Sequence, residues 1–274
     1  EVGRVEWNSV VTIGLPVGSG ETSEPTIYGN VFGAVKGVRT HGYSALLRGN
    51  TFVTVQANAK VGKSIYGGGE IASVGKYNVA DAAYHANHPE VEVGMPYSLG
   101  NEKSGYCNVI VRGNAEIGPD NMVMYNETTG KPDDTGHVFG AGKGVLPYEG
   151  ITGTEKPGRM APNNAMEYYT ETDYVPTGTE TYLDAYLLYI ESLALATHTE
   201  VTIGGDAFVK GSVYGGSENG HVQHDTHVTI EGECQIGAGY DTTTKKSLAE
   251  AMKAHDADVQ AAIDEGSDDG HAEP

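Results

Sequence analysis

One short sequence unit occurs twice between residues 197 and 237, and it restricts the folds open to this chain. The tripeptide Val-Thr-Ile stands at 201–203 and again at 228–230, with glycine-rich turns between the two copies. A strand of three to five residues cannot bury an apolar face alone, so its copies must stack to build a core. The repeat therefore predicts short strands stacked along one axis.

Related strands bring the number of copies to five. The further copies begin at Val11, Val53 and Val109. A second strand, which ends in an aromatic residue and a glycine, occurs in four copies. We expect like strands to pair in parallel ladders about 4.8 Å apart, with the first and third side chains inside and the middle one outside. The predicted ladders are Val53, Val109, Val201 and Val228 in the first strand, and an aromatic stack of Phe32, Tyr66, Phe139 and Tyr214 in the second.

This pattern predicts an all-β fold, a β-solenoid over residues 1–240. Departures from the compact spacing predict large corner insertions near residues 38–48, 71–106, 119–136 and 145–197. In the first copy Leu15–Val17 replaces the Ala-x-Val segment of the other copies, and residues 14–30 are expected to form a loop. Trp7 is expected to help cover the open end of the first coil, because an uncovered coil is an unpaired edge.

Two segments have helical periodicity instead. Residues 181–196 place leucine and isoleucine near helical spacing, which predicts one inserted amphipathic helix against the flank of the solenoid. Residues 247–263 also have an apolar stripe. We therefore expect residues 241–274 to form a C-terminal helix followed by an acidic tail, as a cap for the last coil or a connection to further sequence.

The repeats resemble those of a group of bacterial proteins. Units of the form VTI-x-G-x-A-x-V-x-G-S-VYGG, interrupted by insertions, are similar to the Gly-rich repeat regions of large surface-exposed proteins of Bacteroides-type gut bacteria. The resemblance covers residues 198–237 closely, and residues 9–70 and 107–118 more loosely. It implies a right-handed parallel β-helix, an adhesin-like role and an extracellular location at the bacterial cell surface. The repeat contains no catalytic motif, so the resemblance implies architecture and location more than activity.

Charge and composition restrict the partners. The net charge is −20, from 37 acidic and 17 basic residues, so nucleic acids and anionic lipids are not expected to bind. No apolar run approaches the ~18 residues needed to cross a bilayer, and we expect no membrane insertion. The chain begins with Glu and shows no export signal, so we expect a piece of a longer protein. Cys107 and Cys234 occupy different points of the repeat, which argues against a disulfide.

No cofactor is expected. An acidic surface can collect Ca²⁺ loosely, but residues 215–220 lack the Asp and the middle Gly of the calcium-binding nonapeptide, so no calcium site is signalled.

Two groups of residues are candidates for binding, and none is a candidate for catalysis. A tyrosine-rich patch can stack against sugars, although packing beneath a long loop is the alternative. Its members are Tyr168, Tyr169 and Tyr174. Three histidines can ligate a metal ion only if the chain turns among them, because strand side chains alternate; the alternative is three exposed polar positions. They are His221, His224 and His227.

These features favour a non-enzymatic, surface-exposed structural or adhesive module that displays loops to an extracellular glycan or protein. One alternative is a filament subunit that self-associates end to end. The other is a polysaccharide lyase or glycosidase, because parallel β-helices also host such enzymes. An enzyme of that kind needs carboxylates or bases on one outer face. The outward positions of the first strand provide neither: Thr12, Thr54, Ile110, Thr202 and Thr229.

Overall fold

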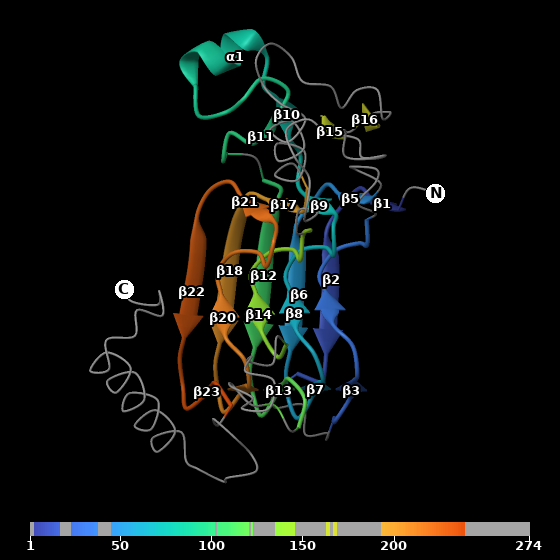
Figure 1. Cartoon of the computed structure of the whole chain (residues 1–274). Coiled ribbons are helices and arrows are strands. Elements are labelled where there is room, and N and C mark those ends of the chain that lie inside the picture. Colours follow the sequence, from blue (N-terminus) through green and yellow to red (C-terminus); the bar gives the residue numbers. More distant parts are fainter. Residues whose placement is uncertain are drawn as a thin grey trace, which may run out of the picture.

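The computed structural model describes residues 3–16, 23–37, 45–101, 103–120, 122, 135–145, 163–164, 167–168 and 193–238 (Figure 1). Within these ranges almost every element is a short strand, and the one α-helix is α1 (Ala82–Asn87). The strands of the described residues pair in parallel except for two small antiparallel pairs. The expectation of an all-β fold is therefore confirmed for the described residues.

The five copies of the Val-Thr-Ile strand lie side by side in one parallel sheet, which Figure 1 shows from its face. Its strands, in order, are β2 (Ser9–Ile13), β6 (Thr51–Val55), β12 (Tyr106–Val111), β18 (His198–Ile203) and β22 (Thr226–Ile230). The register places the first valine of each copy opposite its counterparts. These cross-strand neighbours are Val11, Val53, Val109, Val201 and Val228.

Two further parallel sheets follow the first one in the same order along the chain. One contains β3 (Thr26–Ile27), β7 (Lys60–Val61), β13 (Glu116–Ile117), β19 (Phe208–Val209) and β23 (Gln235–Ile236). The other contains β4 (Val31–Phe32), β8 (Ile65–Tyr66), β14 (Val138–Phe139) and β20 (Val213–Tyr214). The chain thus returns to the first sheet after each passage, so residues far apart in sequence become neighbours.

Short parallel strands also precede the first sheet in each repeat, and the repeat pattern did not reveal them. One sheet contains β1 (Gly3–Val5), β5 (Ala45–Leu47) and β9 (Ser73–Val74), and a pair contains β17 (Leu195–Ala196) and β21 (His221–Val222). The backbone N–H of Leu195 donates to the Ser73 hydroxyl at 3.1 Å, which links the two groups. Three of the four predicted insertions therefore contain a strand that belongs to the repeat.

Two expectations for the N-terminal repeat are wrong. Residues 14–30 are not all loop, because Ile27 of β3 pairs with Val61 and takes the position expected for the Leu15–Val17 segment. A longer connection in this copy hides the strand from a search at fixed spacing. Trp7 does not cover the first coil, since its side chain is 83% exposed.

Most residues of the two predicted helices lie outside the described part of the chain. Leu195 and Ala196 are extended in β17, so a helix does not reach the end of residues 181–196. The rest of that helix, residues 181–192, and the C-terminal unit 241–274 lie outside the described residues.

The main core lies between the three repeated sheets. Val53 and Val55 of β6 are buried while Thr54 between them is not, which is the alternation expected for a strand with one inner face. The same holds for Val109 and Val111 in β12. At the far edge this alternation of burial is lost, because the inward-facing Val228 and Ile230 of β22 are 37% and 56% exposed. Burial is therefore completed only where a strand has neighbours on both sides.

An aromatic stack and a row of glycines form one corner of the repeat. The rings of Phe32, Tyr66, Phe139 and Tyr214 are stacked with centroid distances of 4.8, 5.0 and 4.9 Å, close to the spacing of the strands that carry them. Each ring is followed by a glycine: Gly33, Gly67, Gly140 and Gly215. A Cβ on Gly67 would overlap the carbonyl oxygen of Gly140 in the next copy, so the stack requires glycine there.

Candidate functional site

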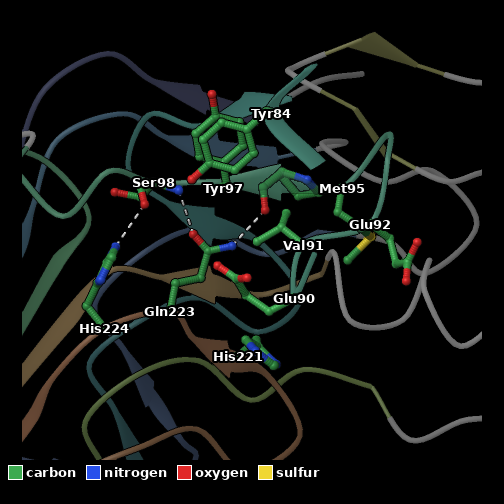
Figure 2. A pocket seen from close by; sticks show the side chains of 11 residues that line it. Tyr84, Glu90, Val91, Glu92, Met95, Tyr97, Ser98, His221, Gln223 and His224 are labelled. Carbon is green, nitrogen blue, oxygen red and sulfur yellow. Dashed lines mark hydrogen bonds between the residues drawn. The ribbon is translucent and has the colours of Figure 1, made fainter. Parts of the chain in front are cut away.

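A cleft of about 350 Å³ lies where the insertion between β9 and β12 meets the corner between β21 and β22 (Figure 2). The insertion contains β10 (Asn78–Val79), α1 and β11 (Pro96–Tyr97). The cleft is lined from the insertion by Tyr84, Glu90, Glu92 and Tyr97, and from the corner by His221, Gln223 and His224. The two sides are far apart in sequence and meet only because the chain repeats.

The insertion is ordered by its own local contacts. Asp81 caps α1, and its carboxylate accepts a hydrogen bond from the backbone N–H of Tyr84 at 2.7 Å. The ring of Tyr84 stacks on that of Tyr97 with centroids 3.8 Å apart, so the helix packs on β11. Nδ1 of His85 donates to the carbonyl oxygen of Val91 at 2.8 Å, which holds the segment after the helix. These contacts place two aromatic rings along one side of the cleft.

The Gln223 side chain fixes β11 to the repeat. Its Oε1 accepts from the backbone N–H of Ser98 at 2.8 Å, and its Nε2 donates to the carbonyl oxygen of Pro96 at 2.7 Å. A strand presents these two backbone groups on one edge, so one amide satisfies both (Figure 2). Nε2 of His224 donates to the carbonyl oxygen of Ser98 at 2.9 Å. Three hydrogen bonds therefore hold residues 95–100, which we call the cleft wall.

His224 also belongs to a stack of three rings. His198 lies between Tyr106, with centroids 4.5 Å apart, and His224, with centroids 5.1 Å apart. Desolvation by burial, and then the charge of His224, lower the pKa of His198, while Asp225 raises it. The carboxylate of Asp225 is 4.0 Å from Nε2 of His198 and almost fully exposed, so water screens most of its effect. The stack therefore favours a neutral His198.

A glycine in the cleft wall permits this packing. Gly100 has φ +77°, and a Cβ there would lie 2.9 Å from Cε1 of His224. A larger residue would therefore be strained in the backbone and would also push the imidazole out of the stack.

The cleft suits a small polar ligand with one apolar face. The carboxylates of Glu90 and Glu92 can accept hydrogen bonds, and Tyr97 offers aromatic surface, whereas the ring of Tyr84 is already stacked between Tyr97 and His88. Glu90 is already partly engaged, because its Oε1 is 3.3 Å from Nδ1 of His88. Sites of this volume, with few polar groups at defined positions, are typical of small-molecule binding.

The structure places some of the predicted binding residues at the cleft and leaves others outside the described part of the chain. Tyr168 is in β16 (Glu167–Tyr168), which pairs with β15 (Asn163–Asn164), while its side chain, Tyr169 and Tyr174 lie outside the described residues. His221 lines the cleft, His224 bonds to the cleft wall, and His227 pairs in register with Glu200 on β18. No group of three or more His, Cys, Asp or Glu within the described ranges can hold a metal ion. The shared metal stays a prediction, and we assign no ligands.

The residues that build the cleft were not predicted. Gln223 stands in the HVQHDTH segment between two of the candidate histidines, and its partner Ser98 is 125 residues away. A single sequence gives no signal for such a pair, because the insertion can fold over any of several corners.

Comparison of the chain with protein-family models, with curated proteins and with solved structures finds no match in any of the three. Within the described part of the chain, no helix has the length and apolarity needed to span a bilayer.

Proposed function

We propose that the repeated strands form a right-handed parallel β-helix that acts as a non-enzymatic binding module at the bacterial cell surface. The β-helix is supported by the parallel register of like strands in every repeat. Right-handedness rests on the general rule for parallel crossover connections and on the sequence resemblance. The extracellular location rests on that resemblance as well.

The observation that supports binding best is the cleft between the insertion and the corner at residues 221–224. A stiff stack of strands holds one wall, and the inserted helix and β11 supply the other. Carbohydrates combine hydroxyl donors with apolar ring faces, which match carboxylates and tyrosine rings respectively. We infer that the ligand is a glycan, and that the candidate tyrosines near residue 170 are not needed for this site.

Charge selects among glycans. Glu90 and Glu92 line the cleft, and the chain has a net charge of −20. Uronic acids and sulfated sugars would meet like charge on approach, whereas neutral or amino sugars would not. The preferred ligand is therefore a neutral or basic sugar.

A filament that assembles end to end is the second candidate. Val228 and Ile230 of the edge strand β22 are 37% and 56% exposed, and β22 has a described neighbour on one side only, β18. A further strand from another copy would bury both side chains and satisfy the open backbone edge. Net negative charge on each copy opposes this contact.

A polysaccharide-degrading enzyme is less well supported. The outer position in the middle of the repeated tripeptide holds four threonines and one isoleucine in register, and the neighbouring outer row holds Glu200 beside His227. The threonines and the isoleucine cannot serve as a general acid or base near neutral pH, and Glu200 is the one carboxylate in the two rows, so these rows of the described strands lack the paired carboxylates that glycosidases use.

The test is a glycan array with the purified protein, alongside light scattering over a range of concentrations. We expect a monomer that binds neutral or amino sugars, and we expect Tyr97→Ala to lose at least about 1 kcal/mol of binding free energy, roughly fivefold in affinity. Tyr28→Ala is the matched control, because Tyr28 is 87% exposed and does not line the cleft. Equal losses in both variants would refute the cleft as the site, and polymers without glycan binding would favour the filament.

A further inference from the structure

The cleft wall is held to the repeat partly through a histidine stack, and histidine is the side chain whose charge changes near neutral pH. Its closing contacts are the three hydrogen bonds to Pro96 and Ser98 and the packing of the His224 ring on Gly100. Two of these four contacts involve His224. Any change that moves this ring therefore changes the closure of the cleft.

His198 is poorly suited to accept a proton in the closed arrangement. Its side chain is only 17% exposed, and its Nδ1 is buried without a hydrogen-bond partner among the described residues. In the neutral ring Nδ1 can remain an unprotonated acceptor, with the proton on Nε2 facing Asp225. Protonation places an N–H on Nδ1, where no described group accepts it.

The groups around this stack do little to stabilise a positive charge on His198. Tyr106 packs on one face of His198 and His224 on the other, so an imidazolium at position 198 has a second ionisable ring beside it. Asp225 is the nearest carboxylate, and it is 97% exposed. On the side of the insertion, the backbone of Ser98 and Gly100 meets His224, and Glu90, Glu92 and His221 line the cleft itself.

We propose that the His198–His224 stack makes the cleft pH-responsive: it holds the cleft wall closed at neutral pH and releases it in mild acid. Proton uptake by His198 separates the two rings, and His224 then withdraws from Ser98 and Gly100. Release of a bound glycan in acid would follow, and that consequence alone rests on the proposed function. The protein would then bind its ligand near neutral pH and release it in an acidic environment.

The direction follows from the lowered pKa of His198. A histidine that stays neutral when closed stabilises the closed form above its ordinary pKa of 6.5, and this stabilisation is lost progressively as the pH falls below that value. If His198 is protonated only in the open form, the open fraction rises by up to about tenfold between pH 7.5 and 5.5. The core between the three repeated sheets contains no part of this stack, so the fold itself persists.

Hydrogen–deuterium exchange of the cleft wall tests this without any ligand. Rates for the amides of residues 95 and 97–100 are measured at pH 7.5 and 5.5 and divided by the intrinsic rates at each pH, with residues 53–55 in the core as the reference. We expect the wall to exchange up to about tenfold faster at pH 5.5 and the reference to stay unchanged. A wall that exchanges equally at both values would overturn the proposal.

Two variants identify the group responsible. His198→Phe keeps a flat ring between Tyr106 and His224 but cannot be protonated, so the acid-dependent rise should disappear. His227→Phe is the matched control, because His227 is exposed on β22 and lies outside the stack, and its rise should remain. A rise that survives in His198→Phe, or that chelation of metal ions with EDTA abolishes, would contradict the mechanism.

If His198→Phe fails to fold, an NMR titration of the wild-type imidazoles decides the question. His198 should titrate below its ordinary pKa of 6.5. A midpoint at or above that value would overturn the proposal. Failure of the glycan array would leave these exchange and titration results intact, so the two ideas can fail separately.

Discussion

Replacement of Gly67 by alanine tests the packing of the corner most directly. A Cβ at this position would overlap the carbonyl oxygen of Gly140 and lie 2.9 Å from Cγ2 of Val109. Both neighbours belong to the next copy, and one is backbone, so the two copies must move apart. The backbone hydrogen bond from Gly67 to Phe139, 2.9 Å, and the stack of Tyr66 on Phe139 would be weakened together.

The expected cost follows from these contacts. Loss of a backbone hydrogen bond costs about 1 kcal/mol, weakening of an aromatic stack about 0.5–1.5 kcal/mol, and overpacking by the added methyl group about 1–3 kcal/mol. We expect Gly67→Ala to lower the free energy of unfolding by about 3–5 kcal/mol, a large part of the total for a typical domain.

Urea unfolding followed by circular dichroism provides the measurement. Gly216→Ala is the matched control, since it changes a glycine of another copy of the same motif and a Cβ there meets no atom within 4 Å. We expect this control to change the free energy of unfolding by less than about 0.5 kcal/mol. Similar midpoints for Gly67→Ala and the wild type would refute the close approach of the copies at this corner.

Three further outcomes can be measured on the same protein. Val111 is fully buried, so Val111→Ala should lower the free energy of unfolding in urea by about 2–3 kcal/mol. Val10 is 71% exposed, so Val10→Ala should lower it by less than about 0.5 kcal/mol. Equal losses would contradict the assignment of inner and outer faces in the first sheet. Gln223→Glu keeps an acceptor for the Ser98 N–H but loses the amide donor to Pro96, so hydrogen exchange at residues 97–100 should rise several-fold while the core stays protected. Unchanged exchange there would contradict the role of Gln223. Burial raises the pKa of the Cys107 thiol to about 12. A thiol reagent at pH 8 should therefore modify Cys234 much faster than Cys107 in the native protein, and should modify both cysteines after unfolding. Rapid labelling of Cys107 in the native protein would contradict its burial.

The strand pairing could be predicted because the sequence contains the repeat several times. Val53, Val109, Val201 and Val228 stand at the same point of their units, and similar units favour the same neighbours. Where the spacing breaks, prediction fails: Ile27 of β3 was hidden by a longer connection in the first copy. The strands near Leu46, Val74 and Leu195 were hidden in the same way, by the insertions beside them.

The amino-acid sequence by itself determined the alternation of inner and outer side chains, the aromatic stack and the need for glycine at its corner. These depend on the period of a strand and on contacts between equivalent positions, both of which a repeat makes visible. The tertiary structure decided where the insertion between β9 and β12 packs. Gln223 meets β11, and His198 meets His224, only after the strands have stacked, because these contacts join positions that have no common pattern in sequence. The cleft and its proposed response to pH belong to that second class.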